Sequence, residues 1–158
     1  MHNFSELYDQ YASDIYRFAL WLSSNPMDAE DITAETFARA WVRIGSIRME
    51  TLKGYLLKIA RNIFLTRQRK RGRDMTLEDG FPDPSPGPEA MTEVRITLAN
   101  VNAFLQTLPE CDRTAFLLRV QYDLPYGEIA RVLEVSEVAA RVKVHRTRKK
   151  LLFQMIKE

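Results

Sequence analysis

The stretch "YGEIARVLEVSEVAARVKVHRTRKKL", residues 126–151, holds two helical patterns that are joined by a short turn. Ser136 stands just before the second pattern, where its hydroxyl can accept a hydrogen bond from the first turn of a helix. Two helices joined in this way predict a helix-turn-helix, the motif whose second helix enters the major groove of DNA. The apolar residues expected to pack these helices together are Ile129, Ala130, Leu133, Val138 and Val142.

The second of these helices is strongly basic. Residues 141–150, "RVKVHRTRKK", carry six Lys or Arg and no acid, with His145 not counted. A cationic run of this kind suits the phosphates that line a groove of DNA. The alternative is an ordinary helical hairpin with a basic tail, and this stretch taken alone leaves that alternative open.

A second basic run lies at residues 53–73, "KGYLLKIARNIFLTRQRKRGR". It contains eight Lys or Arg and no acid, although the formal net charge of the whole chain is only +2. The spacing predicts a helix from about Leu52 to Arg71. The residues expected to point inward are Leu52, Leu56, Ile59 and Ile63, and those expected on the opposite face are Lys58, Arg61, Asn62, Leu65 and Arg69, with Tyr55 at the edge.

The outer face of this helix combines three kinds of group that bind nucleic acid. Long cations bind phosphates, an Asn can hydrogen-bond a base edge, and a Tyr can stack on an exposed base. A solvated basic face is the alternative, but a helix that is merely soluble usually mixes charges of both signs. Two basic helices far apart in the chain therefore favour DNA as the partner.

Residues 74–93 separate the two basic regions. They contain four of the seven prolines, two of the six glycines and six acids, without hydrophobic periodicity. Such a composition buries too little apolar surface to order itself, so we expect a flexible linker. The predicted organisation is a domain at 1–73, a linker at 74–93 and a second domain at 94–158.

The first fifty residues predict two helices. The first carries an apolar stripe and is broken at "SSNP"; the second is expected to start near Asp28, as its N-cap, and to run to Gly45. The first stripe is Phe4, Leu7, Tyr8, Tyr11, Ile15, Phe18 and Leu22; the buried face of the second helix is expected to be Ala29, Thr33, Thr36, Phe37, Ala40 and Ile44.

The second helix also carries acids along one face, in "DAEDITAETFARAW", residues 28–41. Asp28, Asp31 and Glu35 share that face. Acids in a first turn favourably meet the helix dipole, and outward acids can also form a docking surface for a basic partner. A metal site is the sharper possibility, but no His is near and these carboxylates lack a cage. Residue chemistry does not separate the first two interpretations.

The remainder of the chain completes an all-α prediction, because strand signals are nearly absent. An apolar stripe is ended by Pro109, and "CDRTAFLLRVQY" starts a further helix with Asp112 near its N-terminus. Cys111 is alone, so we expect neither a disulfide framework nor a cysteine metal site, and the free thiol is expected to pack rather than to sense oxidants. The stripe before Pro109 is Val94, Leu98, Val101, Leu105 and Leu108.

Several classes of protein are disfavoured. No apolar run approaches about 20 residues and no signal peptide precedes "MHNFSELYDQ", so we expect a cytoplasmic protein without membrane insertion. No P-loop, nucleophile–base pair or metal constellation is evident. We therefore expect neither an enzyme nor a bound cofactor.

In order along the chain, "DAEDITAETFARAW", "LLKIARNIFLTRQRKR", a variable linker and "LPECDRTAFLLRVQYDLPYGEIARVLEVSEVAARVKVHRTRKKL" resemble the sigma factors of bacterial RNA polymerase. The match is to the extracytoplasmic-function group of the sigma-70 family, which keeps only regions 2 and 4. The resemblance covers nearly the whole chain apart from the linker. One helix-turn-helix would be a weak signal, but three ordered segments are a specific one.

The resemblance implies a division of labour between three surfaces. The acidic helix would dock on the clamp helices of the polymerase β′ subunit, the first basic helix would capture bases of the promoter −10 element during melting, and the last helix would read the −35 element. It also implies an anti-sigma factor as a partner. The implied residues are Asp28, Asp31, Glu35, Phe37 and Trp41 for core polymerase; Tyr55, Lys58, Arg61, Asn62 and Arg67 for −10 DNA; and Ser136, Arg141, Lys143, His145, Arg146 and Lys149 for −35 DNA.

The chain departs from the family pattern at the turn and at the start of the last helix. Glu134 stands where the family often has Gly, and a left-handed backbone there would cost Glu about 1 kcal/mol more. Ala139 and Ala140 replace a usual Thr-Val pair, Val142 replaces a common Ser, and the tryptophan often found near Tyr55 is missing.

We therefore predict an alternative sigma factor that binds core polymerase and directs promoter recognition, strand opening and initiation. A stand-alone repressor or activator is one alternative, but it leaves the acidic and the first basic helix without a role. A sigma mimic that sequesters an anti-sigma protein is the other, although a mimic would be expected to lose its cationic faces.

Overall fold

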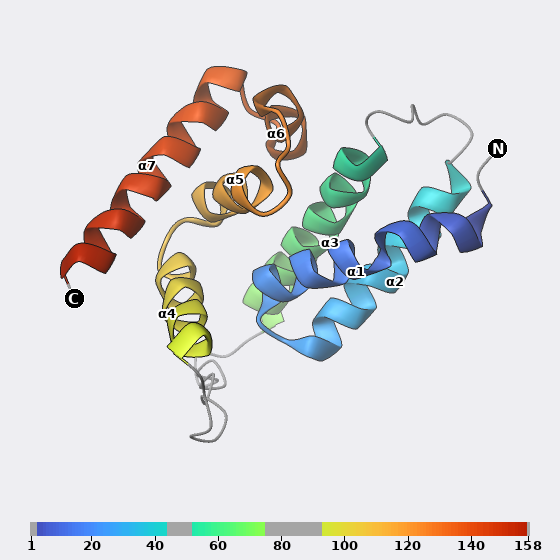
Figure 1. The fold of residues 1–158 in the computed structure, drawn as a ribbon. Coiled ribbons are helices and arrows are strands. Elements are labelled where there is room, and N and C mark those ends of the chain that lie inside the picture. Colours follow the sequence, from blue (N-terminus) through green and yellow to red (C-terminus); the bar gives the residue numbers. More distant parts are fainter. Residues whose placement is uncertain (1–2, 44–51, 75–92, 158) are drawn as a thin grey trace. The chain divides into compact units, whose positions relative to one another are not determined.

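The computed structural model describes residues 3–43, 52–74 and 93–157, and within them the chain forms seven helices and no strand. The chain divides into two compact units, Met1–Asp79 and Gly80–Glu158, which are described separately (Figure 1). The division falls within the range predicted as a linker, of which residues 75–92 lie outside the described residues. The predicted all-α fold is confirmed.

Helix α1 spans Phe4–Ser23 and follows the predicted apolar stripe. The Asn3 side chain accepts a hydrogen bond from the Glu6 backbone N–H at 2.8 Å, which satisfies one of the unpaired donors of the first turn. At the other end Ser24 adopts a left-handed backbone and donates its N–H to the Leu20 carbonyl at 2.8 Å. The stripe residues that are fully buried are Leu7, Ile15, Phe18 and Leu22.

Helix α2 spans Pro26–Val42, and its predicted N-cap was wrong. Asn25 caps the helix, because its side-chain oxygen accepts from the N–H groups of Met27 and Asp28 at 2.9 and 3.1 Å. Pro26 at the first helical position has no N–H to satisfy, so the helix begins earlier than Asp28. Five of the six residues expected on the buried face are buried; Ile44, and also the expected end at Gly45, lie outside the described residues.

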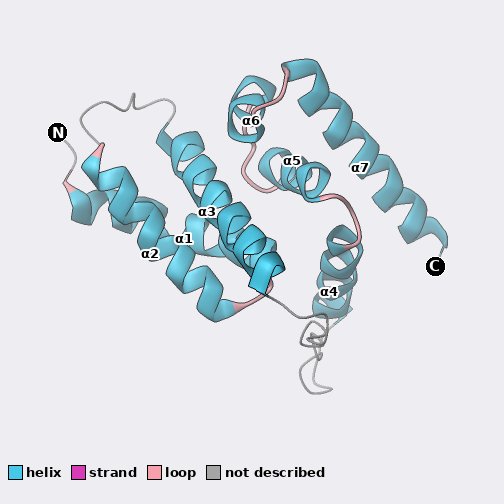
Figure 2. Cartoon of the chain, turned by 180° about the vertical axis from the view of Figure 1, so that it is seen from behind, coloured by secondary structure: helices cyan, strands magenta, loops and turns pink. Residues whose placement is uncertain are grey.

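Helix α3 spans Leu52–Asp74 and packs on both α1 and α2, which completes a three-helix bundle (Figures 1 and 2). Because two helices cover it, its buried arc is wider than one stripe. Leu57 and Ala60 are fully buried beside the predicted positions, and Ile59 is only half-buried. Arg61 is also buried, so its predicted place on the outer face was wrong.

The second unit contains four helices: α4 (Glu93–Gln106), α5 (Glu110–Val120), α6 (Tyr126–Leu133) and α7 (Glu137–Lys157). Helices α5, α6 and α7 contact one another, and α4 contacts α5. Figure 2 shows α6 and α7 joined by a short turn, as predicted for a helix-turn-helix. The largest fully buried side chains among the described residues of this unit are Leu105, Leu118, Ile129 and Val132.

The side of α7 that faces the core differs from the predicted one. Val138 and Val142 are 70% and 49% exposed, although both were expected to pack against α6. Ala140, Val144 and Thr147 are buried instead, at spacings of four and three residues. The prediction favoured the branched apolar residues over a small Ala and a Thr, and so it rotated the helix away from its true inward face.

The turn between α6 and α7 contains a left-handed residue at Glu134, the position where the resembled family often has Gly. Glu134 adopts a left-handed conformation, with φ 59° and ψ 45°, and its N–H donates to the Ala130 carbonyl. Ser136 caps α7 as predicted, because its hydroxyl accepts from the Ala139 N–H at 3.0 Å. The turn therefore fixes where the second helix begins.

Within the described parts of the chain, no helix combines the length and apolar character needed to cross a membrane. Across the same ranges, no cluster of three or more His, Cys, Asp or Glu is placed to hold a metal ion.

Candidate nucleic-acid interface

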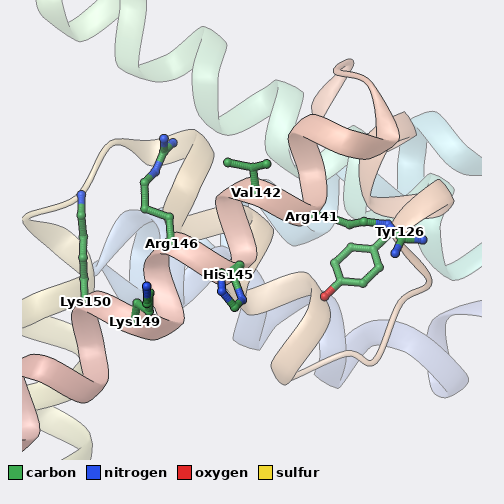
Figure 3. A pocket seen from close by; sticks show the side chains of 7 residues that line it. All are labelled: Tyr126, Arg141, Val142, His145, Arg146, Lys149 and Lys150. Atoms are coloured by element: carbon green, nitrogen blue, oxygen red, sulfur yellow. The ribbon is translucent and has the colours of Figure 1, made fainter.

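The exposed side of α7 forms an open groove together with the first residue of α6 (Figure 3). The side chains along α7 follow two rows at four-residue spacing, so they lie side by side on one surface. Among the residues that the structure describes, no acid lines this groove. The residues of this α7 groove are Tyr126, Arg141, Val142, His145, Arg146, Lys149 and Lys150.

Arg141 is held at one end of the α7 groove by two contacts. Its Nη2 donates to Glu137 Oε1 at 3.1 Å, one turn earlier on the same helix. Its guanidinium carbon also lies 5.0 Å from the centre of the Tyr126 ring, which Figure 3 shows beside it. Cation–π attraction and the ion pair together restrict the long Arg side chain to one region of the groove.

Tyr126 is a candidate site residue that sequence reasoning missed. Arg119 on α5 also stacks on its ring, with 4.8 Å between the guanidinium carbon and the ring centre. Arg119 Nη1 in turn donates to the Leu124 carbonyl at 3.1 Å. The sequence does show an aromatic residue at the start of the first helix of the helix-turn-helix. Its role could not be predicted from that, because its partners Arg119 and Arg141 come from two other helices.

Lys143 and Arg146 are paired with a buried acid of another helix. Both donate to the buried carboxylate of Asp112 on α5: Arg146 Nη2 reaches its two oxygens at 3.0 and 3.1 Å, and Lys143 Nζ reaches one at 3.4 Å. The Lys143 side chain is only 21% exposed, whereas that of Arg146 is 48% exposed. Arg146 therefore faces the groove, and Lys143 lies mostly beneath it.

His145 and Lys149 are exposed in the α7 groove, and the structure gives their side chains no hydrogen bond or ion pair within the described residues. Arg148 and Lys150 are exposed in the same way. Lysine ammonium groups of this kind move freely and bind phosphates as point charges. Ser136 is exposed as well, but its hydroxyl already caps the helix.

Fewer of the α3 residues predicted to bind −10 DNA are exposed than expected. Asn62 is exposed, and Tyr55 and Lys58 are half-buried at the surface. Arg61 is 7% exposed, which leaves little of it to contact DNA. Arg67 is half-buried because it reaches across to the acids of α2.

The acids of α2 and the arginines of α3 form a line of ion pairs, which we call the α2–α3 seam. Arg71 Nη2 donates to Asp28 Oδ1 at 2.6 Å, and this hydrogen bond, against the opposing effect of burial, lowers the pKa of Asp28. Arg67 lies 3.7 Å from Asp31 and 4.0 Å from Glu35. The seam thus joins residues that sequence analysis assigned to two different partners.

Exposure divides the five residues predicted to meet a docking partner. Asp31 is exposed and Glu35 is half-buried at the surface, where it also pairs with Arg39 at 2.5 Å, whereas Asp28 is buried in the seam. Phe37 is 1% exposed, as expected for the buried face, and its ring centre lies 5.1 Å from that of Tyr8. Its implied part in polymerase binding stays a prediction.

Trp41 remains accessible near the C-terminal end of α2. Its ring is 42% exposed and meets the Phe4 ring edge-on at 5.5 Å. The docking candidates on α2 that reach the surface are therefore two acids and one aromatic ring: Asp31, Glu35 and Trp41.

Comparison with known families matches both units. A family model described as sigma-70 region 2 matches residues 7–74, and one described as sigma-70 region 4 matches residues 98–151. The first match covers α1 from Leu7 onward, α2 and α3, and the second covers most of α4, all of α5 and α6, and α7 as far as Leu151.

Comparison with individual proteins gives the same family. The chain is 30% identical over 151 residues to the ECF RNA polymerase sigma factor SigM of Bacillus subtilis, covering 92% of this chain and 91% of that protein. It is 36% identical over 157 residues to the ECF RNA polymerase sigma factor SigE of Mycolicibacterium smegmatis, covering 96% of this chain but only 61% of the longer relative.

Among solved structures, the fold is similar to the sigma factor RpoE from Bartonella quintana, which was crystallised in complex with the anti-sigma factor NepR. The TM-score is 0.75 at 25% identity, and the match covers 94% of this chain and 93% of that one. Family matches to both units, similarity to SigM over 92% of the chain and the shared fold lead to one assignment: the chain belongs to the ECF sigma factors of the sigma-70 family.

Proposed function

We propose that this chain binds bacterial core RNA polymerase and directs it to a specific set of promoters, where it helps to open the DNA. The observation that carries the proposal is that each compact unit presents one basic helix, α3 in the first and α7 in the second. The chain acts without catalysing a reaction itself, and its place of action is the bacterial cytoplasm.

The α7 groove is the proposed reader of the −35 element. It is the exposed side of the second helix of a helix-turn-helix, and its lining within the described ranges contains no acid. Arg141 and Arg146 are held in place by protein contacts, as suits groups that read base edges. Lys149 and Lys150 have no such contacts within the described residues and are suited to phosphates.

Helix α3 is the proposed surface for the −10 element. Asn62 and Tyr55 are neutral, so they add little to the attraction of intact duplex. Once a base leaves the stack, the amide can hydrogen-bond it and the ring can stack on it, which contributes about 1–3 kcal/mol per stacked base. That gain offsets the few kcal/mol that unpairing costs.

The exposed acids of α2, with Trp41, are the proposed handle for polymerase. Asp31 and Glu35 form only long or exposed ion pairs, which in water contribute about 0–1 kcal/mol each. A basic partner surface can therefore compete for them at little cost. The relatives SigM and SigE are named as RNA polymerase sigma factors, which supports this partner.

Two DNA-reading units in one chain also favour promoter binding through effective concentration. When one unit binds its element, the other is held near its own element, so the second contact becomes intramolecular. A promoter with both elements at the right spacing is then bound more tightly than either element alone.

A pull-down with core polymerase tests this proposal against a stand-alone repressor. The full-length chain should retain purified core polymerase on beads, and the bound complex should retain a duplex promoter more strongly than either component does. A chain that binds duplex DNA but never core polymerase would contradict the proposal.

We also propose an anti-sigma factor as a second partner. The support is that the similar sigma factor RpoE was crystallised with the anti-sigma factor NepR. Affinity capture from the native host, followed by a transcription assay, tests this idea. The captured protein should inhibit transcription that depends on this chain, and failure of every captured protein to do so would contradict it.

A further inference from the structure

Asp112 is a buried carboxylate that lies beneath the α7 groove. Its side chain is 5% exposed, and it accepts hydrogen bonds from Arg146 on both oxygens and from Lys143 on one. Its backbone carbonyl also accepts a weak bond from the Thr147 hydroxyl at 3.4 Å. One residue of α5 therefore binds three residues of α7: Lys143, Arg146 and Thr147.

The position of Asp112 in the fold makes it a fixed anion. It lies in the first turn of α5, where the helix dipole favours a negative charge. The neighbouring residues Thr114 and Ala115 are fully buried, so the backbone around it is anchored in the core. Because the carboxylate is fixed, the cations that bind it are held at its position.

Arg146 is therefore anchored at one nitrogen and open at the others. Nη2 is bound to Asp112, whereas Nε and Nη1 have no hydrogen bond within the described residues. About half of the side chain remains exposed, on the side that lines the groove. An unanchored Arg would swing among many rotamers and could reach nearby phosphates, but this one presents its free edge in a defined place.

The contrast with Lys149 and Lys150 shows what the anchor changes. Those two side chains line the same groove and have no ion pair within the parts of the chain that the structure describes. Free cations raise affinity for any DNA, because they neutralise phosphates wherever the duplex lies. An anchored cation gives less general attraction but more dependence on which base edge it meets.

We propose that Asp112 is a positioning residue for promoter discrimination: it holds Arg146 toward base edges and withholds Lys143 from phosphates. The inference rests on the proposed reading of DNA by the α7 groove. Asp112 touches no DNA in this role. It lowers binding to random sequence and so widens the difference between promoter and random DNA.

The test compares Asp112→Asn with the wild type in reconstituted polymerase. The probes are a duplex selected from a random-sequence pool by the wild-type holoenzyme and a random duplex of equal length, each titrated at several salt concentrations. The variant should bind random duplex more tightly, with a salt dependence steeper by about one unit of log K per log salt. Its preference for the selected duplex should fall by at least about fivefold.

Asp123→Asn is the matched control, because it changes the same charge in the same unit. The Asp123 side chain is 93% exposed, and its ion pair is with Arg119 at 3.9 Å and not with a cation that lines the groove. It should leave the preference and the salt dependence near wild type. An equal effect in both variants would show that net charge alone acts, and would overturn the proposal.

Two further arms separate positioning from folding. In an Arg146→Ala background, Asp112→Asn should no longer reduce the preference, since the group that it positions is gone. Arg146→Lys keeps the charge on an exposed side chain, so it should keep the affinity for random duplex and lose the preference for the selected duplex. This variant keeps the test decisive if Asp112→Asn does not fold. Retained preference in Arg146→Lys would overturn the proposal.

Failure of the proposed function would look different. In that case the wild-type holoenzyme itself would select no duplex from the pool, so there would be no preferred duplex on which to compare the variants. A wild type that discriminates and an Asp112→Asn variant that discriminates equally well would reject only the role of Asp112.

Discussion

Arg71 on α3 donates a hydrogen bond to Asp28 on α2 at 2.6 Å. Asp28 belongs to the acidic face assigned to polymerase, and Arg71 belongs to the basic run assigned to DNA. Arg67 repeats the relationship with Asp31 at a longer distance. The two proposed surfaces of the first unit are therefore in electrostatic contact, and a change to one changes the charge that the other presents.

The Asp28–Arg71 pair predicts a pH dependence of stability. The hydrogen bond from Arg71 lowers the pKa of Asp28 below its ordinary 3.8. A carboxyl with a lowered pKa contributes stability that is fully present above its unfolded pKa and is lost as pH falls through its folded pKa. The free energy of unfolding lost in Asp28→Asn, measured by urea denaturation, should therefore be constant above about pH 5 and shrink toward pH 3.

Glu30→Gln is the control for that experiment, because Glu30 is exposed on the same helix and has no hydrogen bond or ion pair within the described residues. It should cost little stability at any pH. A loss in Asp28→Asn that is the same at pH 3 and pH 7 would show that the pair does not stabilise the fold through its charge.

Charge reversal on α2 should separate polymerase binding from folding. Asp31→Lys with Glu35→Lys should abolish association with core polymerase, because both carboxylates belong to the proposed handle. The fold should persist, since the exposed pairs that are lost contribute about 0–1 kcal/mol each. Co-migration with core polymerase in size-exclusion chromatography and helicity by circular dichroism measure the two effects.

Glu30→Lys is the control, because it reverses one charge at an exposed position of the same helix. At 100° per residue, position 30 lies about 100° around the helix from 31 and about 140° from 35, so it is outside the proposed docking face. It should keep polymerase binding. Unchanged polymerase affinity in the double variant, with normal helicity, would remove the docking role of this face.

The α7 groove should divide into base-reading and phosphate-binding cations. Arg141→Ala and Arg146→Ala should each cost about 1–3 kcal/mol of preference for promoter over random duplex. Lys149→Ala should weaken binding to both duplexes alike and flatten the salt dependence by roughly one phosphate. Competition binding over a salt series measures both quantities.

Tyr126→Leu should reproduce part of the Arg141→Ala loss, because it removes the ring that the guanidinium lies over. If Arg141→Ala and Arg146→Ala each weaken binding to promoter and random duplex equally, these arginines contact the DNA backbone and do not read bases.

Neutral residues of α3 should matter for opening and not for duplex binding. Asn62→Ala and Tyr55→Ala should impair strand opening, because each removes a group that captures an unstacked base. A template with a pre-melted bubble should rescue much of the defect, since unpairing no longer has to be driven. Permanganate footprinting and run-off transcription on duplex and bubble templates compare these variants.

Gln68→Ala is the control for opening, since it removes another exposed neutral side chain from α3. It should open duplex promoters normally. Normal opening by Asn62→Ala and Tyr55→Ala would mean that α3 only attracts DNA through its charge and does not capture bases.

The left-handed turn predicts a stabilising substitution. Glu134 has φ 59°, where a residue with a Cβ is strained relative to glycine. Glu134→Gly should therefore raise the free energy of unfolding by about 0.5–1 kcal/mol. Arg131→Gly, three residues earlier in the right-handed helix, should lower it by about 1 kcal/mol. Thermal melts that shift in the same direction for both would contradict the assigned strain.

The sequence predicted the elements of this fold well where spacing alone decided them. The stripe of α1, the helix-turn-helix and the cap at Ser136 follow from local rules that one stretch of chain contains. The buried face of α7 did not follow, because Val138 and Val142 are apolar yet exposed. Which face turns inward depends on α5 and α6, and those partners are distant in sequence.

The candidate site was predicted in its residues more than in its contacts. The acids of α2 and the cations of α3 were assigned separately, because no local pattern shows that they pair across two helices. Arg61 was placed outside for a similar reason: a single stripe does not reveal that two helices cover α3. Asp112 and Tyr126 acquire their roles only from side chains that the fold brings to them.

Transcription by reconstituted polymerase tests the central claim most directly. Core polymerase with and without the full-length chain would transcribe a library of genomic fragments, and the start sites would be mapped by sequencing transcript 5′ ends. The account predicts new start sites that appear only with the chain and share two upstream elements at a fixed spacing. Start sites that are identical with and without the chain, although it remains bound to polymerase, would contradict the account.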